Sequence, residues 1–362
     1  MLPSNAEVLD INKLVTTGTR EKTRRFAEFI AVYFGEFIRA ESKTWFWKER
    51  GRYKSVLRHQ QALADAFMAL LSGYGKVQKF FYAYWIHNSC IMLGLLKRRK
   101  AIGSFVCRGH SIDLYDRDWA LARYIRPLPF HRFKIDQASA IFPVSRHGED
   151  HLKKKYKWLA GKIKALHLGV RDCGTSCLDH KAVFTLVSCS NFSANKRIEK
   201  IMAILAHIPI ELRWVHFGGG EGMEKAVHAA KDLPPNIHVE WKGFVPNGKI
   251  MEYYAGNSIN LFINVSEAEG LPVSMMEAIS FGIPVMATAV YGNPEIANET
   301  TGFCIPFDFD EKAVAALITQ FAGDIRLQEA KRLQARRFYQ HHFSSNENYS
   351  RFTGELLKYP NP

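Results

Sequence analysis

The stretch SEAEGLPVSMMEAISFGIPV, residues 266–285, predicts the fold of the second half of the chain. It follows an apolar run at 259–265 that is typical of a buried strand, and it continues into a helix that begins near Pro272. A helix that starts where a strand ends places free N–H groups and the positive end of its dipole there. We therefore expect a diphosphate-like anion to bind, with Leu271 and Val273 as donors, because Pro272 has no N–H.

Two carboxylates accompany this helix start. Glu269 lies in the loop beside Gly270, and Glu277 lies about one and a half turns into the helix. Carboxylates repel a phosphate, so we expect them to face sugar hydroxyls. The alternative is that both are merely solvated.

Short apolar runs recur through the second half, with helix-compatible stretches between several of them, at 182–189, 212–217, 237–244, 259–265, 284–288 and 302–305. This alternation predicts a doubly wound parallel sheet that binds ligands at the carboxyl ends of its strands. Lys196 and Arg197 stand at a helix start after one such strand, where cations oppose the dipole unless an anion binds. Gly218 and Gly219 allow a ligand close to the backbone, or simply make a tight turn.

The first half repeats the strand and helix pattern less clearly. Strands are expected at 80–85, 102–108, 138–145, 163–168 and at 6–11, and helices at 21–39, 60–71 and 87–97. Apolar periodicity lapses at 171–180, where we place the domain boundary. His110 follows an expected strand, where an imidazole can contact a phosphate or sugar oxygen, although a lone His is more often structural.

Charge separates the two halves. Lys and Arg exceed Asp and Glu by 14 over 362 residues, but residues 1–170 hold 31 against 14, and residues 171–362 hold 18 against 21. The basic half fits nucleic acid, an anionic membrane or a phosphorylated substrate. Six scattered cysteines make no disulfide framework, and a reducing, cytoplasmic setting fits best. No apolar run predicts a spanning helix or a secretion signal.

Together these segments resemble the family 4 (group 1) glycosyltransferases of the GT-B fold. The resemblance rests on Glu269 and Glu277 within EGLPVSMMEA, on GIPVMAT at 282–288 and on GNPEI at 292–296. Supporting matches are NKRI at 195–198, GGG at 218–220, GFVP at 243–246, TGF at 301–303, and, in the first half, RGHSIDLY at 108–115, FPVS at 142–145 and LGV at 168–170.

The resemblance implies an α/β chain of two Rossmann-like domains. Residues 1–172 would form the acceptor domain, residues 180–345 the nucleotide-sugar domain, and residues 346–362 a helix that returns to the first domain. The implied activity is a retaining glycosyltransferase of the hexosyltransferase type (EC 2.4). It would need neither a metal nor a cofactor and would use a nucleoside diphosphate sugar and a saccharide or lipid-linked acceptor, in surface polysaccharide assembly.

The resemblance also implies residue roles. Glu277 would bind the ribose, Glu269 the hydroxyls of the donor sugar, and Lys196 the diphosphate. The remaining roles fall to Phe244 and Val245 for the base, to amides near Leu271 and Val273 for the diphosphate, and to His110 for the donor sugar or the acceptor.

Two departures from the family pattern stand out. Asn191 occupies the position of an Arg five residues before Lys196, and Arg197 is our candidate to replace that charge. The opening residues MLPSNAEVLD resemble a later strand of the fold, so we expect the first domain to lack about 40 to 60 residues, its first βα unit or two.

Our first hypothesis is an enzyme that is cytoplasmic and peripheral on the inner membrane face. The basic runs at 97–100 and 153–157 are candidate lipid contacts, with a solvated face as the alternative. Other possibilities are a GT-B nucleotide-sugar epimerase or hydrolase, and a non-catalytic protein that binds sugar nucleotides or nucleic acid. The pair of glutamates argues against nucleic acid as a partner.

Overall fold

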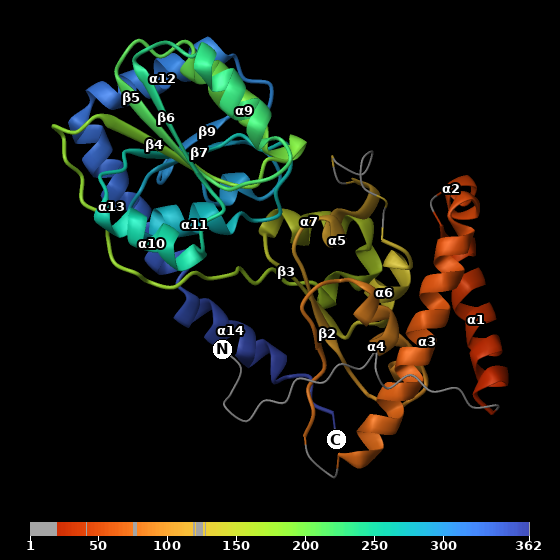
Figure 1. Cartoon of the computed structure of the whole chain (residues 1–362). Coiled ribbons are helices and arrows are strands. Elements are labelled where there is room, and N and C mark those ends of the chain that lie inside the picture. Colours follow the sequence, from red (N-terminus) through yellow and green to blue (C-terminus); the bar gives the residue numbers. More distant parts are fainter. Residues whose placement is uncertain are drawn as a thin grey trace.

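The structure, a computed structural model, describes residues 20–40, 42–74, 78–118, 120, 126 and 128–361. Two parallel sheets lie side by side, each with helices packed against it (Figure 1). This arrangement confirms the predicted α/β class. The strand expected at 6–11 lies outside the described residues.

The second sheet has six parallel strands in the order β6-β5-β4-β7-β8-β9. Their bounds are β4 Phe184–Cys189, β5 Leu212–Phe217, β6 Ile237–Gly243, β7 Leu261–Asn264, β8 Val285–Thr288 and β9 Gly302–Ile305. Every apolar run predicted in this half is therefore a strand. The order reverses between β4 and β7, so loops after these two strands meet at the switch point of a doubly wound sheet.

Helices cover both faces of this sheet because successive strand residues point to opposite sides. Leu186 and Trp214 pack with one set of helices, whereas their neighbours Val187 and Val215 pack with the other. The first set is α8 Ile198–Leu205, α9 Met223–Ala229 and α12 Glu311–Gly323, and the second is α10 Asn247–Gly256, α11 Val273–Ser280 and α13 Ile325–His342. Burial on both faces accounts for the nearly continuous apolar runs.

The first sheet has three parallel strands, β1 Tyr82–Ala83, β2 Val106–Gly109 and β3 Ala140–Pro143, in that order. Its helices are α1 Arg20–Arg39, α2 Lys43–Lys48, α3 Arg50–Gly73, α4 Asn88–Arg98, α5 Ile112–Tyr115, α6 His131–Gln137 and α7 Arg146–Lys155. The predicted helices at 21–39 and 87–97 match α1 and α4 within a residue. The helix predicted at 60–71 starts ten residues earlier, and α2 was not predicted.

The strand predicted at 163–168 is wrong. Ile163 makes a single bridge to β3, and the amides of Lys164 and Leu166 donate to Ile141 and Pro143. A side chain occupies two backbone carbonyls of this segment. The Arg108 guanidinium donates to the carbonyls of Leu166 at 2.6 Å and His167 at 2.8 Å. The segment therefore follows the sheet edge without becoming a ladder strand.

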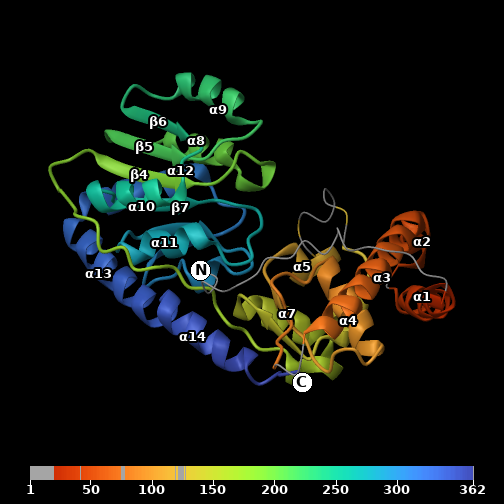
Figure 2. The same ribbon diagram turned by 60° about the horizontal axis from the view of Figure 1, so that its bottom comes forward.

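The chain crosses back to the first domain at its end. Figure 2 shows α13 followed by α14, Ser345–Leu356, which runs to the first domain. Phe352 of α14 packs against Val106 and Phe142 on the face of the first sheet that the other helices leave open. Within the described part of the chain, no helix is both long and apolar enough to cross a bilayer.

Candidate functional site

The loop between β7 and α11 lies at the carboxyl edge of the second sheet, as predicted. Pro272 precedes the first residue of α11 in an extended conformation, and Val273 begins the helix. Leu271 is buried and Val273 is exposed. The loop therefore holds its apolar side chain in the core and leaves the helix start at the protein surface.

The structure brings Lys196 and Glu269 together at this edge. Lys196 Nζ lies 2.5 Å from Glu269 Oε1, and the side chains are only 21% and 12% exposed. Asn264 at the end of β7 donates to the same carboxylate oxygen at 3.3 Å. Two residues predicted from separate loops thus form one partly buried ion pair.

Asn195 holds the two loops in this arrangement, a role that the sequence did not reveal. Its side-chain amide donates to the carbonyl of Ala268 at 3.0 Å, and its Oδ1 accepts from the amide of Ala268 at 2.9 Å. Its own carbonyl accepts from the amide of Glu267 at 2.8 Å. In the sequence, the one indication of a role for Asn195 was its position as the first residue of NKRI.

Glu277 faces a cavity of about 550 Å³ beside the domain linker. Asn247, at the start of α10, donates to Glu277 Oε1 at 2.8 Å. Burial raises the pKa of Glu277, and the hydrogen bond from Asn247 opposes this rise only in part. Glu277 is therefore a half-buried, oriented carboxylate and not a freely solvated one. Asn247 was not predicted.

The glycine turn after β5 lies against the turn after β6. The amide of Gly218 donates to the carbonyl of Gly243 at 2.8 Å, and a Cβ at Gly219 would meet the amide nitrogen of Phe244 at 3.7 Å. Gly218 has φ +139°, and a Cβ there would lie 1.7 Å from the Ser190 carbonyl oxygen, so this position requires glycine. Beside this turn Phe244 is 88% exposed and Val245 half-buried.

Two predicted residues have other partners. The Arg197 guanidinium donates to the Phe307 carbonyl at 3.3 and 3.4 Å and lies over the Phe307 ring at 4.7 Å. Asn191 is exposed, and its side-chain oxygen accepts from the Ser193 hydroxyl at 2.9 Å. Neither contact joins these residues to the pair of Lys196 and Glu269.

His110 meets this site from the first domain through its backbone. A Cβ on Gly270 would lie 1.6 Å from the His110 carbonyl oxygen, so glycine alone permits this approach. The imidazole contacts two rings, that of Tyr84 at 4.6 Å and that of Trp85 at 4.2 Å. Burial lowers its pKa, and its Nε2 lies 2.9 Å from the Tyr84 carbonyl. A carbonyl only accepts, so Nε2 carries the proton of a neutral ring.

A carboxylate of the second domain fastens the domains together. Glu295 accepts from the amides of Arg146 and His147, both at 2.9 Å, and contacts His167 Nε2 at 3.0 Å. Those amides are the first of α7, whose positive end favours a carboxylate. Burial raises the pKa of Glu295, but the hydrogen bonds outweigh it and leave the pKa below its ordinary value.

One comparison with known proteins covers the second domain. Residues 180–337 match the family model of glycosyl transferases group 1. This group 1 match contains both loops, the ion pair and Glu277, and it covers β4 through most of α13.

Two curated glycosyltransferases are similar to parts of this chain. The GtfA subunit of UDP-N-acetylglucosamine–peptide N-acetylglucosaminyltransferase from Streptococcus pneumoniae is 26% identical over 201 residues, 51% of this chain and 37% of that protein. The putative colanic acid biosynthesis glycosyltransferase WcaL from Escherichia coli is 33% identical over 89 residues, 23% of this chain and 22% of that protein. The chain thus spans little more than a third of these relatives at most.

A solved structure extends the likeness in fold beyond the group 1 match. Anabaena HepE in complex with UDP superimposes with a TM-score of 0.65 at 16% identity, over 82% of both chains. That span requires both domains, so the two-domain fold is that of GT-B glycosyltransferases.

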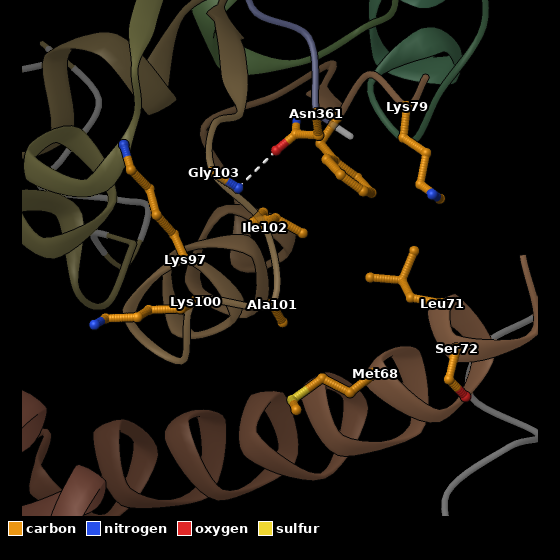
Figure 3. A pocket seen from close by; sticks show the side chains of 11 residues that line it. Met68, Leu71, Ser72, Lys79, Lys97, Lys100, Ala101, Ile102, Gly103 and Asn361 are labelled. Atoms are coloured by element: carbon orange, nitrogen blue, oxygen red, sulfur yellow. Dashed lines mark hydrogen bonds between the residues drawn. The ribbon is translucent and has the colours of Figure 1, made fainter. Parts of the chain in front are cut away.

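A second cavity, of about 750 Å³, lies outside the group 1 match (Figure 3). It opens between α3 and the turn after α4, and Asn361 closes one side by accepting from the Gly103 amide at 2.7 Å. Phe81 and Gly103, which line it, precede β1 and β2. The cavity therefore lies at the amino ends of the strands, away from the edge that carries the ion pair.

Proposed function

We propose that the chain is a glycosyltransferase of the hexosyltransferase type that acts with retention of configuration. It moves a sugar from a nucleoside diphosphate to a saccharide or lipid-linked saccharide during surface polysaccharide assembly, on the inner face of a membrane. The observation that carries this proposal is the ion pair of Lys196 and Glu269 at the start of α11. We propose uridine as the base, because the HepE structure holds UDP and the pneumococcal relative is named for a UDP-sugar.

The ion pair suits a site that must accept both a diphosphate and a sugar. When the donor binds, the Lys196 ammonium pairs with the diphosphate, and the sugar hydroxyls donate hydrogen bonds to the Glu269 carboxylate. Each partly buried charge then exchanges one partner for another, which avoids the cost of an unpaired charge. The α11 amides and the Lys196 ammonium stabilise the charge that develops on the departing diphosphate. No metal or cofactor is part of this proposal.

The proposal assigns the remaining roles as follows. Glu277 keeps one oxygen bonded to Asn247 and offers the other to the ribose hydroxyls. The base lies by Phe244 and Val245, where an exposed ring gains from being covered. The neutral His110 ring donates to Tyr84 and leaves Nδ1 as an acceptor for a hydroxyl of the donor sugar or acceptor.

Titration calorimetry with UDP, GDP and ADP tests the donor site directly. We expect UDP to bind, and Lys196→Ala to weaken its binding by roughly tenfold to a hundredfold through the lost charged hydrogen bond. Lys312→Ala, an exposed lysine of α12, is the matched control and should bind like the wild type. Absence of binding of all three nucleotides, or equal binding by Lys196→Ala, would contradict the proposal.

A further inference from the structure

The outer side of α1 carries a row of exposed apolar side chains. Phe26, Ile30, Phe34 and Ile38 follow one another every four residues and are between 41% and 70% exposed. Four-residue spacing aligns them along one side of the helix. Trp47 of the neighbouring α2 is 58% exposed. Such a continuous apolar strip is uncommon on a surface that faces only water.

A row of cations on α3 accompanies this strip. Arg50, Lys54 and Arg58 are all exposed and have the same four-residue spacing. The Arg50 guanidinium lies 5.5 Å from the Trp47 ring, and the Lys54 ammonium lies 5.9 Å from the Tyr33 ring. Their charged groups thus lie over aromatic rings of α1 and α2 and are still exposed.

The carboxylates of this region are turned inward. Among the described residues from 23 to 74, none of the Asp or Glu side chains is exposed. Glu28 and Asp65 pair with Arg99 at 2.7 and 2.8 Å, and Glu36 accepts from the Phe133 amide at 3.2 Å. The outer face is therefore apolar and positive, with no exposed negative charge among these residues.

Both views place α1, α2 and α3 on the side of the first domain that is remote from the second domain (Figures 1 and 2). A nucleic acid would neutralise the cations but leave Ile30 and Ile38 of the strip in water. An anionic lipid bilayer offers both an apolar layer and phosphates above it.

We propose that the outer face of α1–α3 docks on an anionic lipid bilayer. Phe26, Ile30, Phe34 and Ile38 enter the boundary between headgroups and acyl chains, and the α3 cations contact lipid phosphates. The contact surface thus differs from the two predicted basic runs. In the run at 97–100, Arg99 is buried in ion pairs and Lys97 donates to Gln137 and Ser139. In the run at 153–157, Lys155 pairs with Asp118 at 2.9 Å. The proposal does not rest on sugar transfer, because bilayer binding is measured without a donor.

Sedimentation with vesicles of phosphatidylglycerol and phosphatidylcholine, and with phosphatidylcholine alone, tests the proposal on the full chain. We expect binding to the anionic vesicles only. Phe34→Ser with Ile38→Ser should weaken it about tenfold or more, because it removes two apolar side chains of the strip that are 46% and 70% exposed in the free protein. Leu333→Ser, an equally exposed apolar residue of α13, is the control and should bind normally.

The charges are tested separately. Lys54→Ala with Arg58→Ala should weaken binding by roughly tenfold or more. Lys154→Ala with Lys157→Ala, two exposed cations in the predicted run at 153–157, should have a smaller effect. Wild-type binding by either α1 or α3 variant would overturn the proposal, and so would a larger loss in the Lys154 and Lys157 variant.

Two further measurements separate a bilayer from other occupants of the strip. Brominated lipid should quench tryptophan fluorescence, and Trp47→Phe should remove most of that quenching. Sedimentation velocity without vesicles should give the same mass for the wild type and for Phe34→Ser with Ile38→Ser. A wild-type dimer that this variant dissociates would instead assign the strip to a second copy of the chain and overturn the proposal.

Discussion

The pairing of Lys196 with Glu269 gives each residue a partner before any donor arrives. A lone partly buried lysine or carboxylate would be costly, and their mutual attraction offsets part of that cost. The hydrogen bond from Asn264 orients the Glu269 carboxylate, and the hydrogen bonds between Asn195 and Ala268 hold its loop. The site is thus organised in the free chain, which lowers the ordering cost of binding.

Glu269→Ala should abolish sugar transfer while leaving the fold intact. The carboxylate is our proposed contact for the donor sugar, and loss of such a group lowers turnover by about two orders of magnitude or more. Release of UDP from a UDP-sugar measures the effect, and circular dichroism checks the fold. Glu224→Ala on α9, an exposed glutamate, is the control. Wild-type turnover in Glu269→Ala would remove this residue from the mechanism.

Helices α1, α3 and α4 share a buried ionic cluster. Asp65 of α3 pairs with Arg24 and Arg25 of α1 and with Arg99 after α4, and Glu28 of α1 binds the same Arg99. With α1 held in this way, its Glu28 and Glu36 point inward. The outward strip on α1 is therefore a consequence of where these ion pairs form.

Asp65→Asn should destabilise the chain by about 3 kcal/mol, because it removes the charge of a buried carboxylate that Arg99, Arg25 and the more exposed Arg24 share. Urea unfolding followed by circular dichroism measures the change. Asp232→Asn, at an exposed position, should change the free energy of unfolding by no more than about 0.5 kcal/mol. Equal stability of the two variants would show that the cluster adds nothing.

The two domains meet through a few specific contacts. Gly270 packs on the His110 backbone, Glu295 binds the start of α7, and the amide of Val170 donates to the Phe343 carbonyl at 2.9 Å where the two crossings of the chain meet. These contacts place the carboxyl ends of both sheets toward one another, which a donor site between the domains requires.

Glu295→Gln should show how the contact between the two domains depends on pH. The folded-state pKa of Glu295 lies below its ordinary value of 4.5, so its contribution is fully present above that value and is lost as the pH falls through the lowered pKa. At neutral pH we expect the variant to be less stable by about 1 to 2 kcal/mol. The difference from wild type in urea unfolding should shrink below about pH 4.5. A difference that grows in acid would contradict this assignment.

The local sequence was enough to predict the six strands of the second sheet, helices α1 and α4, the loop that carries Glu269 and the helix that carries Glu277. Each of these predictions depends on apolar periodicity or on residues that end a strand or begin a helix, and both are properties of neighbouring residues in the sequence. The pairing of Lys196 with Glu269, 73 positions apart, and the binding of Glu295 to Arg146, 149 positions apart, follow from how the chain crosses itself. The contact of Arg197 with Phe307 and the inward direction of the carboxylates behind the α1 strip also follow from how the chain crosses itself. Periodicity shows which side chains are buried, but the choice of partner depends on tertiary geometry, because ion pairs and hydrogen bonds form only over a few ångströms.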